Sequence, residues 1–250
     1  MKENKIQILV LAAGVGKRMG NKELPKVLIP FKGKHLVQHL LDAIKESGVC
    51  EKSALVVGKM ADLVKKALGP DYIYILQPEQ LGTGHAVMTS RKELEGIAQH
   101  IMVWYGDAPL VTSITIKKIA NTHLAEKSVI TMATTKVSDF KDWRQAFNNF
   151  GRIVKDDQGK INKIVEFRDA TAEQKEIKEI NPGYYCFEAD WLWQNLDKLK
   201  NDNDQGEYYL TDLVDMAFKQ GKKITTVDIE PKEALGINTE EQLKSIEKLA

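Results

Sequence analysis

Short apolar runs alternate along the first half of the chain with longer stretches in which apolar positions recur every three to four residues. The run Ile6–Leu11 is almost entirely apolar, which is typical of a strand buried on both faces. In the stretch His35–Glu46, the side chains of Leu36, Leu40 and Ile44 fall on one face of a helix. This alternation predicts an α/β fold, a Rossmann-like, mostly parallel sheet that helices cover on both faces.

The same pattern places the other elements of the first half. Further strands are predicted at Ser53–Val57, Tyr72–Leu76, Ile101–Tyr105 and Val129–Thr134. Further helices are predicted at Met60–Leu68, Gly84–Ala98 and Ile114–Glu126. Ligands of such sheets bind beyond the carboxyl ends of the strands, so the loops that follow the strands are the places to look for chemistry.

The pattern loosens after residue 135. Short strands are predicted at Arg152–Val154, Ile161–Phe167 and Gly183–Glu188, as a small β-rich antiparallel insertion beside the main sheet. Helices at Ala189–Leu199, Glu207–Lys219 and Thr239–Leu249 and a strand at Lys223–Asp228 complete the prediction. No linker interrupts the chain, so we expect residues 1–250 to form one domain with a lobe of about 1–135, a second of about 136–238 and a terminal helix at 239–250.

Two glycines and three cations follow the first strand. Gly14 and Gly16 allow backbone N–H groups to close around an anion, and Lys17, Arg18 and Lys26 can neutralise it. Arginine grips phosphate oxygens bidentately, and lysine acts as a compact charge. Neither a third glycine nor a Gly-Lys-Ser/Thr ending is present, so the loop is neither the dinucleotide fingerprint nor the Walker motif. A triphosphate site is predicted, although a plain turn would show the same glycines.

The segment Gln77–Ala86, QPEQLGTGHA, follows a predicted strand and opens a helix. Glutamine amides offer a donor and an acceptor on one edge, which suits a nucleobase. Gly82 and Gly84 permit a close approach of the backbone. The alternative is a helix-start loop with Thr83 as N-cap.

Asp107 follows the strand Ile101–Tyr105 directly, in the sequence YGDAPL. A carboxylate at this point can hold Mg²⁺ against phosphates, because Mg²⁺ takes one or two protein carboxylates and completes its shell with substrate oxygens and water. A turn would also explain Gly-Asp-x-Pro. Asn238 could be either an N-cap or a metal ligand.

The second lobe offers polar groups of weaker signal. Gly151, Glu166 and Asn181 could hydrogen-bond sugar hydroxyls, although each is also an ordinary turn or strand-edge residue. The segment Gln205–Asp212, QGEYYLTD, reads as a helix start with acidic residues near the positive end of the helix dipole.

The composition excludes several classes of protein. Of 250 residues, 43% are hydrophobic and 28% charged, which is ordinary for a globular protein with a sizeable core. The net charge of +1 and the lack of a basic run argue against nucleic acid as a partner. No apolar run approaches the ~20 residues of a membrane span, and the N-terminus does not read as a signal peptide. Cys50 and Cys186 read as reduced thiols, so a cytoplasmic protein without a membrane partner is expected.

Taken in order, QPEQLGTGHA, YGDAPL, IVEF and QGEYYLTD resemble the sugar-nucleotidyltransferase superfamily, and most of all the bacterial N-acetylglucosamine-1-phosphate uridylyltransferases. The resemblance extends from Leu11 to Asn238. It implies a fold of the nucleotide-diphospho-sugar transferase type, Mg²⁺ as cofactor, and UTP and a sugar-1-phosphate as substrates. It implies transfer of uridylyl to N-acetylglucosamine-1-phosphate, with release of pyrophosphate. The first lobe would then bind the nucleotide and the second the sugar phosphate.

The resemblance also implies a role for each matching position. The nucleotide would contact Leu11, Ala12, Ala13, Gly14, Gly16, Gln77, Gln80, Gly82 and Thr83. The catalytic residues would be Arg18, Lys26 and Asp107. The metal would be held by Asp107 and Asn238. The sugar would contact Tyr105, Gly151, Glu166, Asn181 and Thr211.

The chain departs from the family pattern in the second lobe. Phe150 stands where tyrosine is usual, the stretch Asp139–Phe150 is longer than usual, and Glu240 replaces a common arginine. The larger, bifunctional members carry a hexapeptide-repeat acetyltransferase half. No such repeat occurs here, so uridylyl transfer alone is expected. The alternatives are a nucleotidyltransferase for another sugar-1-phosphate or nucleoside triphosphate, and a non-catalytic regulatory subunit on the same fold.

Overall fold

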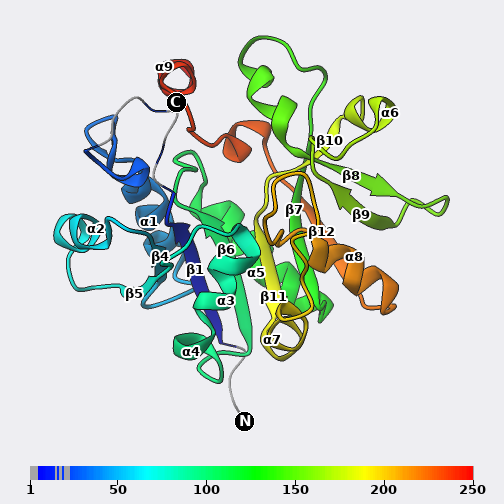
Figure 1. Ribbon diagram of the computed structural model, residues 1–250, viewed down its shortest axis with the longest axis horizontal. Helices are drawn as coiled ribbons and strands as arrows, with labels where there is room; N and C mark the ends of the chain where they lie inside the picture. The colour runs from blue at the N-terminus through cyan, green and yellow to red at the C-terminus, as the bar shows by residue number, and fades with distance from the viewer. Residues whose placement is uncertain (1–4, 15, 17–18, 20–22, 250) are drawn as a thin grey trace.

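The computed structural model describes residues 5–14, 16, 19 and 23–249, and one ten-stranded sheet runs through both halves of the chain (Figure 1). The strand order is β5-β4-β1-β6-β11-β7-β10-β8-β9, and β12 pairs with β7. In the first half the strands are β1 (Ile6–Ala12), β4 (Ala54–Val57), β5 (Ile73–Leu76), β6 (His100–Tyr105) and β7 (Ile130–Lys136). In the second half they are β8 (Gly151–Lys155), β9 (Ile161–Val165), β10 (Glu179–Asn181), β11 (Tyr185–Glu188) and β12 (Ile224–Asp228). A separate hairpin joins β2 (Pro30–Phe31) to β3 (Lys34–His35).

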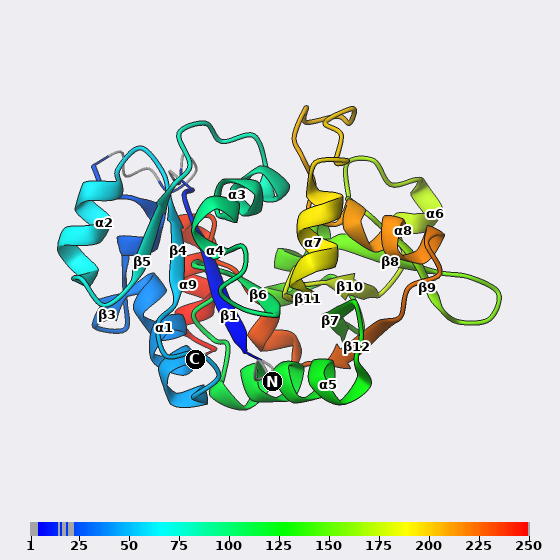
Figure 2. The ribbon, with the colours of Figure 1, turned by 90° about the horizontal axis from the view of Figure 1, so that it is seen from below.

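Helices pack on both faces of this sheet (Figure 2). The α-helices are α1 (Leu36–Ser47), α2 (Ala61–Leu68), α3 (Thr83–Thr89), α4 (Arg91–Leu94), α5 (Ser113–Glu126), α6 (Ala172–Lys175), α7 (Ala189–Leu196), α8 (Asp212–Lys219) and α9 (Glu240–Glu247). Short 3₁₀ helices are η2 (Lys26–Leu28), η3 (Asp142–Asn149) and η4 (Pro231–Ala234). Within the described residues, even α5, with 14 residues, lacks the length and apolarity of a membrane-spanning helix.

The core divides into two clusters, one on each face of the sheet, because successive side chains of a strand point in opposite directions. Along β1, Ile8 and Val10 pack with α1, α5 and α9. Leu9, between them, packs on the opposite face with α3, α4, α7 and α8. These three side chains are fully buried. The prediction of a mostly parallel sheet covered on both faces is therefore confirmed.

The predicted insertion does not lie beside the main sheet, because its strands join that sheet through β7. One edge of β7 pairs with β11 at Ile130 to Met132 and then, past the end of β11, with β10 at Thr135 and Lys136. Strand β10 pairs in turn with β8, and β8 with β9. The length of β7 thus carries the sheet from the first half into the second.

Two predicted helix boundaries are wrong. The single helix expected at Gly84–Ala98 is two, α3 and α4, separated at Ser90, whose hydroxyl donates to the Val87 carbonyl at 2.7 Å. The helix expected from Glu207 begins only at Asp212. The backbone before it hydrogen-bonds to the 81–84 loop, across the molecule, rather than within a helix.

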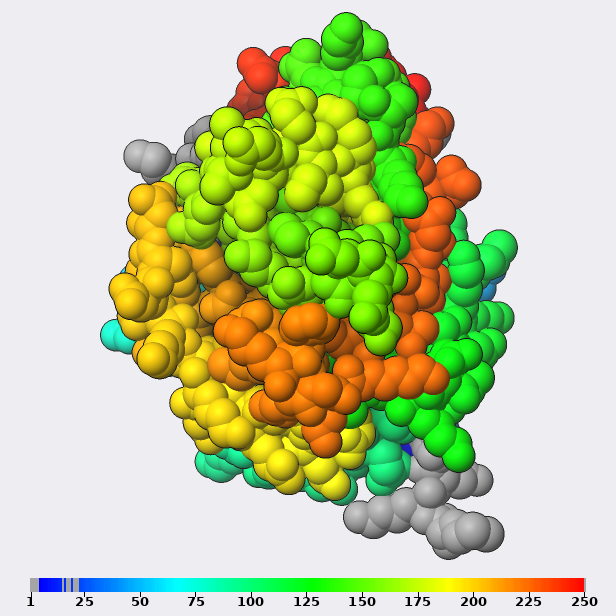
Figure 3. All heavy atoms as spheres, turned by 90° about the vertical axis from the view of Figure 1, so that its right-hand side faces the viewer, coloured from blue at the N-terminus to red at the C-terminus, as the bar shows by residue number. Residues whose placement is uncertain are grey.

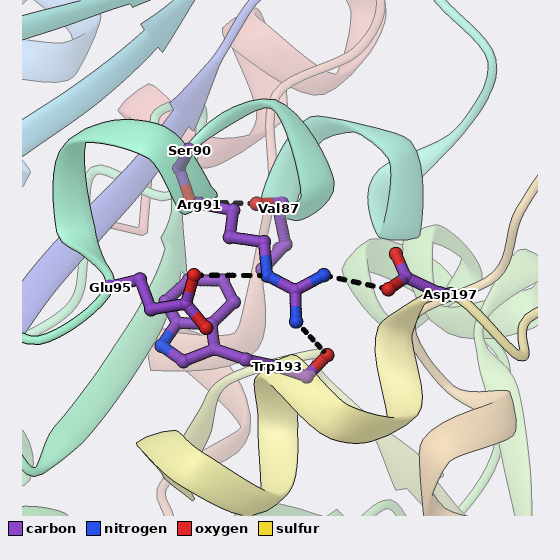
Figure 4. A network of polar contacts seen from close by, with 6 residues as sticks. All are labelled: Val87, Ser90, Arg91, Glu95, Trp193 and Asp197. Atoms are coloured by element: carbon purple, nitrogen blue, oxygen red, sulfur yellow. Dashed lines mark hydrogen bonds and ion pairs between the residues drawn. The ribbon is translucent and has the colours of Figure 1, made fainter.

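Arg91 fastens the helices of the first half to α7 of the second (Figure 4). Its guanidinium donates to the Asp197 carboxylate at 2.7 Å and to the Trp193 carbonyl at 2.6 Å. Glu95 lies 3.4 Å away on the same helical face. Because Arg91 is partly exposed, we expect this contact to fix how α4 lies against α7 and to add little to the free energy of unfolding.

The second half forms one face of the molecule (Figure 3). The segments of β8, β9, α7 and α8 and the loop before α8 cover this view, and the first half shows mainly at its margins. Contacts of α8 with β9 and of α6 with β8 hold this face together. The two halves of the chain are joined within the sheet, where β11 pairs with β6 on one side and with β7 on the other.

A strained residue at the end of α5 gives a stability prediction. Lys127 is the C-cap and adopts the left-handed conformation (φ 49°, ψ 43°), which glycine tolerates better than other residues. Lys127→Gly should raise the free energy of unfolding by about 1 kcal/mol. The matched control, Lys117→Gly in the exposed middle of the same helix, should lower it by about 1 kcal/mol. Urea denaturation followed by circular dichroism measures both, and equal losses in the two variants would contradict strain at Lys127.

Candidate active site

Two adjoining cavities open at the carboxyl ends of β1, β5 and β6. One has a volume of about 240 Å³ and the other about 260 Å³. Both are lined by Thr83, Tyr105, Asp107 and Glu207. Two molecules bound side by side would therefore meet at Asp107.

The first cavity collects most residues that the sequence assigns to a nucleotide. Its lining includes Leu11, Ala13, Gly14, Lys26, Gln77, Gln80, Gly82 and Thr83. Ala12 is not part of it, because its side chain packs into the core on the α1 face of the sheet. Gly16 does not line it either. The predicted cation Arg18 lies outside the described residues, as does Lys17.

Gly16 leaves room for the side chain of Lys26. Its φ of +66° is a left-handed conformation, and a Cβ there would lie 2.9 Å from the Cβ of Lys26. Lys26 itself is held by the short helix η2, in which its neighbours Val27 and Leu28 are buried. The absence of a side chain at Gly16 thus lets the Lys26 stem cross the loop toward the cavity.

The Lys26 ammonium is held by two oxygen atoms from distant parts of the chain. It donates to the Asp107 carboxylate, at the end of β6, and to Asn238 Oδ1 at 2.8 Å. The side chains of Lys26 and Asp107 are only 12% and 17% exposed. Backbone contacts support the arrangement, since the N–H of Ile237 donates to the Asp107 carbonyl at 3.0 Å. Three residues far apart in the sequence therefore form one charged cluster where the cavities meet.

The donor set of this cluster fits Mg²⁺. A carboxylate and an amide oxygen are hard ligands, and both already converge on one cation, the Lys26 ammonium. Among the described residues, no group of three His, Cys, Asp or Glu side chains could enclose a metal. An ion held by Asp107 and Asn238 would thus take its remaining ligands from substrate and water, as Mg²⁺ commonly does.

The two glutamines brace the loop that follows β5. Gln77 is buried, and its Nε2 contacts the Gly82 carbonyl at 3.3 Å and His85 Nδ1 at 3.1 Å. Gln80 Nε2 donates to the Ala13 carbonyl in the loop after β1. Because the Gln77 amide nitrogen is used within the protein, the group that it can offer to a ligand is its carbonyl oxygen.

A strap of backbone hydrogen bonds joins this loop to the second half of the chain. The N–H of Tyr208 donates to the Leu81 carbonyl, and the N–H of Gly84 donates to the Tyr208 carbonyl, both at 2.8 Å. The Leu210 N–H donates to the Thr83 hydroxyl at 3.1 Å, so Thr83 is not the N-cap of α3; Gly82 is. The loop that lines the first cavity and the segment before α8 are therefore tied together by hydrogen bonds.

The second cavity collects every residue that the sequence assigns to the sugar. These residues are Tyr105, Gly151, Glu166, Asn181 and Thr211. Asn238 lines it as well. The amide of Asn181 donates to the Tyr185 hydroxyl at 2.6 Å and accepts from the Gly183 N–H at 3.0 Å. This turn is tight, because a Cβ on Gly183 would lie 2.5 Å from the Tyr105 ring.

Burial shifts the pKa of two groups that line this cavity, Tyr105 and Glu166, and of Asp212, which follows the lining residue Thr211. Burial, followed by the carboxylates of Glu166 and Asp107, raises the pKa of Tyr105 above its usual range, so the phenol stays a hydrogen-bond donor. Burial also raises the pKa of Glu166, against the effect of a 3.0 Å hydrogen bond from the Thr211 hydroxyl. The pKa of Asp212 rises to about 6 through burial and the neighbouring carboxylates of Asp215 and Asp169.

Sequence reasoning missed several residues that line the second cavity. They are Ala108, Asn149, Phe150, Pro182, Gly183, Tyr184, Gln205, Glu207, Tyr209, Ala234 and Gly236. The segment 205–209 was interpreted as a helix start, although its lack of a helical apolar period could have indicated a loop. Asn149 and Phe150 end a stretch in which apolar residues follow neither a helical nor a strand period, and nothing in the sequence indicates that they line a cavity.

The strap gives a first prediction for this site. Gly82 has φ 103° and ψ 176°, and a Cβ there would lie 2.6 Å from the Tyr208 carbonyl oxygen. Gly82→Ala should lower the free energy of unfolding by more than the ~1–2 kcal/mol of a left-handed residue, because the strap must separate. Gly96→Ala, at φ 81° in open space, should show that smaller cost alone. Chemical denaturation compares the two, and equal costs would argue against the strap.

Asp212 gives a pH prediction. Its pKa is about 6 in the folded protein against 3.8 for the free group, so the folded state holds the proton more tightly. The free energy of unfolding should therefore fall as pH rises from 4 to 6 and change no further from this group above that. Asp212→Asn should stabilise the protein at pH 8 but not at pH 4. Asp190→Asn, at an exposed first-turn position of α7, is the matched control and should show no such pH-dependent gain. A constant difference between Asp212→Asn and the parent from pH 4 to 8 would refute the shift.

The fold resembles that of two solved enzymes. A UDP-glucose pyrophosphorylase complexed with UDP-glucose superposes with a TM-score of 0.75 at 18% identity, over 98% of both chains. A 4-diphosphocytidyl-2C-methyl-D-erythritol synthase from Anaerococcus prevotii DSM 20548 gives 0.68 at 17% identity, over 98% of this chain and 96% of that one. At these identities the likeness confirms the predicted fold class.

Sequence comparison identifies the family. The bifunctional protein GlmU of Clostridium novyi (strain NT) is 41% identical over 242 residues, 96% of this chain but 51% of that protein. GlmU of Desulfotalea psychrophila (strain LSv54) is 38% identical over 244 residues, 97% of this chain and 69% of that protein. The chain thus spans about half the length of the Clostridium relative, and these matches confirm the resemblance seen in the motifs. Residues 8–216 match the family model, and the chain belongs to the MobA-like NTP transferase domain family.

Proposed function

We propose that this chain transfers the uridylyl group of UTP to N-acetylglucosamine-1-phosphate, giving UDP-N-acetylglucosamine and pyrophosphate. The observation that carries the proposal is the cluster of Lys26, Asp107 and Asn238 at the junction of two cavities. The relatives named bifunctional protein GlmU support a sugar-1-phosphate substrate. In this proposal the residues of about 1–135 bind the nucleotide and those of about 136–238 the sugar phosphate.

The reaction is a displacement at phosphorus. An oxygen of the sugar phosphate forms a bond to the α-phosphorus of UTP, and the bond from that phosphorus to the bridging oxygen breaks. Pyrophosphate leaves with the electron pair. The attacking oxygen is already anionic, so the chain needs no covalent nucleophile and no strong base. The barrier lies in bringing two anions together in line, which positioning and charge neutralisation can lower.

Lys26 supplies the neutralising charge from the protein. Its four-carbon stem is flexible, so the ammonium can turn from Asp107 toward a phosphate oxygen in the adjoining cavity. Asp107 and Asn238 would hold Mg²⁺, which when bound neutralises charge on the phosphate oxygens. Arg18, outside the described residues, would hold the departing phosphates.

One hydrogen-bond acceptor in the first cavity, the side-chain carbonyl of Gln77, favours uracil over cytosine. The Gln77 amide nitrogen contacts Gly82 and His85, so its carbonyl oxygen is the group available to a base. The N3–H of uracil is a donor and matches that oxygen, whereas N3 of cytosine is an acceptor and does not. The backbone at Leu11, Ala13 and Gly14 would contact the ribose and phosphates.

The second cavity suits an acetamido sugar. Glu166 accepts from the Thr211 hydroxyl, and its other oxygen can accept from a sugar hydroxyl. Phe150 lines the same cavity and offers an apolar wall to an acetyl methyl group. A Cβ on Gly151 would lie 2.8 Å from Cγ2 of Ile164 and 3.5 Å from a Glu166 oxygen, so a side chain there would press on Ile164 and stand beside Glu166. The phenol of Tyr105 remains a donor.

Pyrophosphate release over a panel of nucleoside triphosphates and sugar-1-phosphates tests the specificity. With Mg²⁺ present, UTP and N-acetylglucosamine-1-phosphate should give the highest kcat/KM. A higher kcat/KM with glucose-1-phosphate or another triphosphate would replace the proposed substrates. No pyrophosphate with any pair would favour a non-catalytic role on this fold.

Two matched pairs of variants test the cluster. Lys26→Ala and Asp107→Ala should each lower kcat/KM about 10²–10³-fold, the usual loss on removing a preorganised charge contact. Lys34 and Asp42 form a similar ion pair at the surface, 2.5 Å apart and 55% and 42% exposed. Lys34→Ala and Asp42→Ala should leave kcat/KM within about twofold. If Lys26→Ala or Asp107→Ala retained full turnover, the cluster would have no part in catalysis.

A further inference from the structure

Arg152 is fully buried (0% exposed), and its hydrogen bonds end on backbone carbonyls rather than on an acidic side chain. Its Nη2 donates to the carbonyl of Asn148 at 3.0 Å, and its Nη1 to those of Phe150 and, at 3.3 Å, Phe147. Its Nε donates to the carbonyl of Lys175, at the end of α6, at 3.2 Å. One guanidinium thus gathers four carbonyls from two separate segments.

Aromatic rings complete the surroundings of this charge. The guanidinium carbon lies 4.6 Å from the centroid of Phe140 and 5.3 Å from that of Phe167. Burial lowers the pKa of Arg152, but arginine remains charged in proteins. A buried charge is costly unless its donors are met, and backbone carbonyls accept from four of the five N–H groups here. Arg152 is therefore a buried charge whose partners are backbone carbonyls and aromatic rings.

The carbonyls that Arg152 holds lead directly into the second cavity. Asn149, Phe150 and Gly151 all line it, and they lie between the held carbonyl of Asn148 and Arg152 itself. Arginine is a planar fork with fixed donor directions, so it dictates where these carbonyls point. The orientation of the backbone at 148–150 in turn decides how the side chains of Asn149 and Phe150 face the cavity.

The same guanidinium also contacts the strand end that carries Glu166. Phe167, whose ring centroid lies 5.3 Å from the guanidinium carbon, directly follows Glu166, the buried carboxylate of the cavity. Across the sheet, Arg152 is paired with Val165, one residue before Glu166. The neighbouring lining elements Asn149–Gly151 and Glu166 are therefore both connected to one buried side chain, in addition to the pairing of β8 with β9.

We propose that Arg152 is a positioning residue that shapes the sugar-phosphate cavity and so tunes the choice of sugar without touching it. The proposal rests on the proposed function for the identity of the ligand. It adds a residue that acts through Asn149, Phe150 and Glu166 rather than on the reacting groups.

The test is Arg152→Lys, which keeps the charge but replaces a five-donor fork by a single ammonium. The KM for N-acetylglucosamine-1-phosphate should rise about tenfold, the size of one lost charge-assisted hydrogen bond. The KM for UTP should stay within about twofold, since none of the hydrogen-bond or ring partners of Arg152 lines the first cavity. The ratio of kcat/KM for N-acetylglucosamine-1-phosphate to that for glucose-1-phosphate should fall. The matched control is Arg144→Lys in η3, whose guanidinium pairs with Asp139 near the surface, and it should change neither KM.

A milder variant guards against loss of the fold. Phe140→Leu removes one aromatic ring that contacts the guanidinium. It should also raise the KM for N-acetylglucosamine-1-phosphate, by a smaller factor than Arg152→Lys. Equal rises in both KM values, or a lowered melting temperature with an unchanged sugar KM and selectivity ratio, would overturn the proposal. If the parent protein uses a different sugar-1-phosphate, the proposed function is wrong. The KM for that sugar-1-phosphate is then compared with the KM for UTP in the same variants, so the role of Arg152 is tested independently of the proposed substrate.

Discussion

The site depends on the attraction between one ammonium and two oxygens that the chain brings from far apart. Lys26 is 81 residues from Asp107 and 212 residues from Asn238. Such a meeting requires that the loop after β1, the end of β6 and the segment after η4 all be fixed. Buried apolar side chains anchor all three segments: Val27 and Leu28 in η2, Trp104 and Ala108 at the end of β6, and Leu235 and Ile237 after η4. The buried apolar side chains therefore hold Lys26 within hydrogen-bonding distance of Asp107 and Asn238.

The segment that carries Asn238 is held by a buried carboxylate. Glu233 accepts from the N–H of Thr112 at 2.9 Å and from its hydroxyl, and from the Thr115 hydroxyl at 2.6 Å. The hydroxyl of Tyr184, from the loop before β11, donates to the Glu233 carbonyl at 2.8 Å. A negative charge at the start of α5 also suits the helix dipole. Through these contacts η4 is tied to α5 and β11, and Asn238, five residues on, is set opposite Asp107.

The fold was predictable where the apolar pattern is long, and the site where a motif ends a strand. Strands such as β1 and β6 are continuous apolar runs, and Asp107 follows one of them. Strand β10 escaped prediction because its three residues, beginning with Glu179, form a strand only by pairing between β7 and β8. The loop before α8 was mistaken for helix because its hydrogen bonds go to residues more than 120 positions away. Arg152 gave no signal either, since the carbonyls that it binds are common to every residue.

The two cavities differ in the charged groups that line only one of them, and under the proposed function this difference would orient the substrates. The first cavity alone has the Lys26 ammonium and the glycine-containing backbone after β1, which attract phosphates. Among the acidic side chains, Glu166 lines the second cavity alone, where it can accept hydrogen bonds from sugar hydroxyls, whereas Asp107 and Glu207 line both cavities. In the proposed reaction a triphosphate would therefore lie on the Lys26 side and a sugar phosphate on the Glu166 side, with their phosphates at the junction where Lys26, Asp107 and Asn238 meet. Glu166 would contribute to this arrangement by favouring sugar hydroxyls over phosphates in its own cavity, without touching the reacting phosphorus.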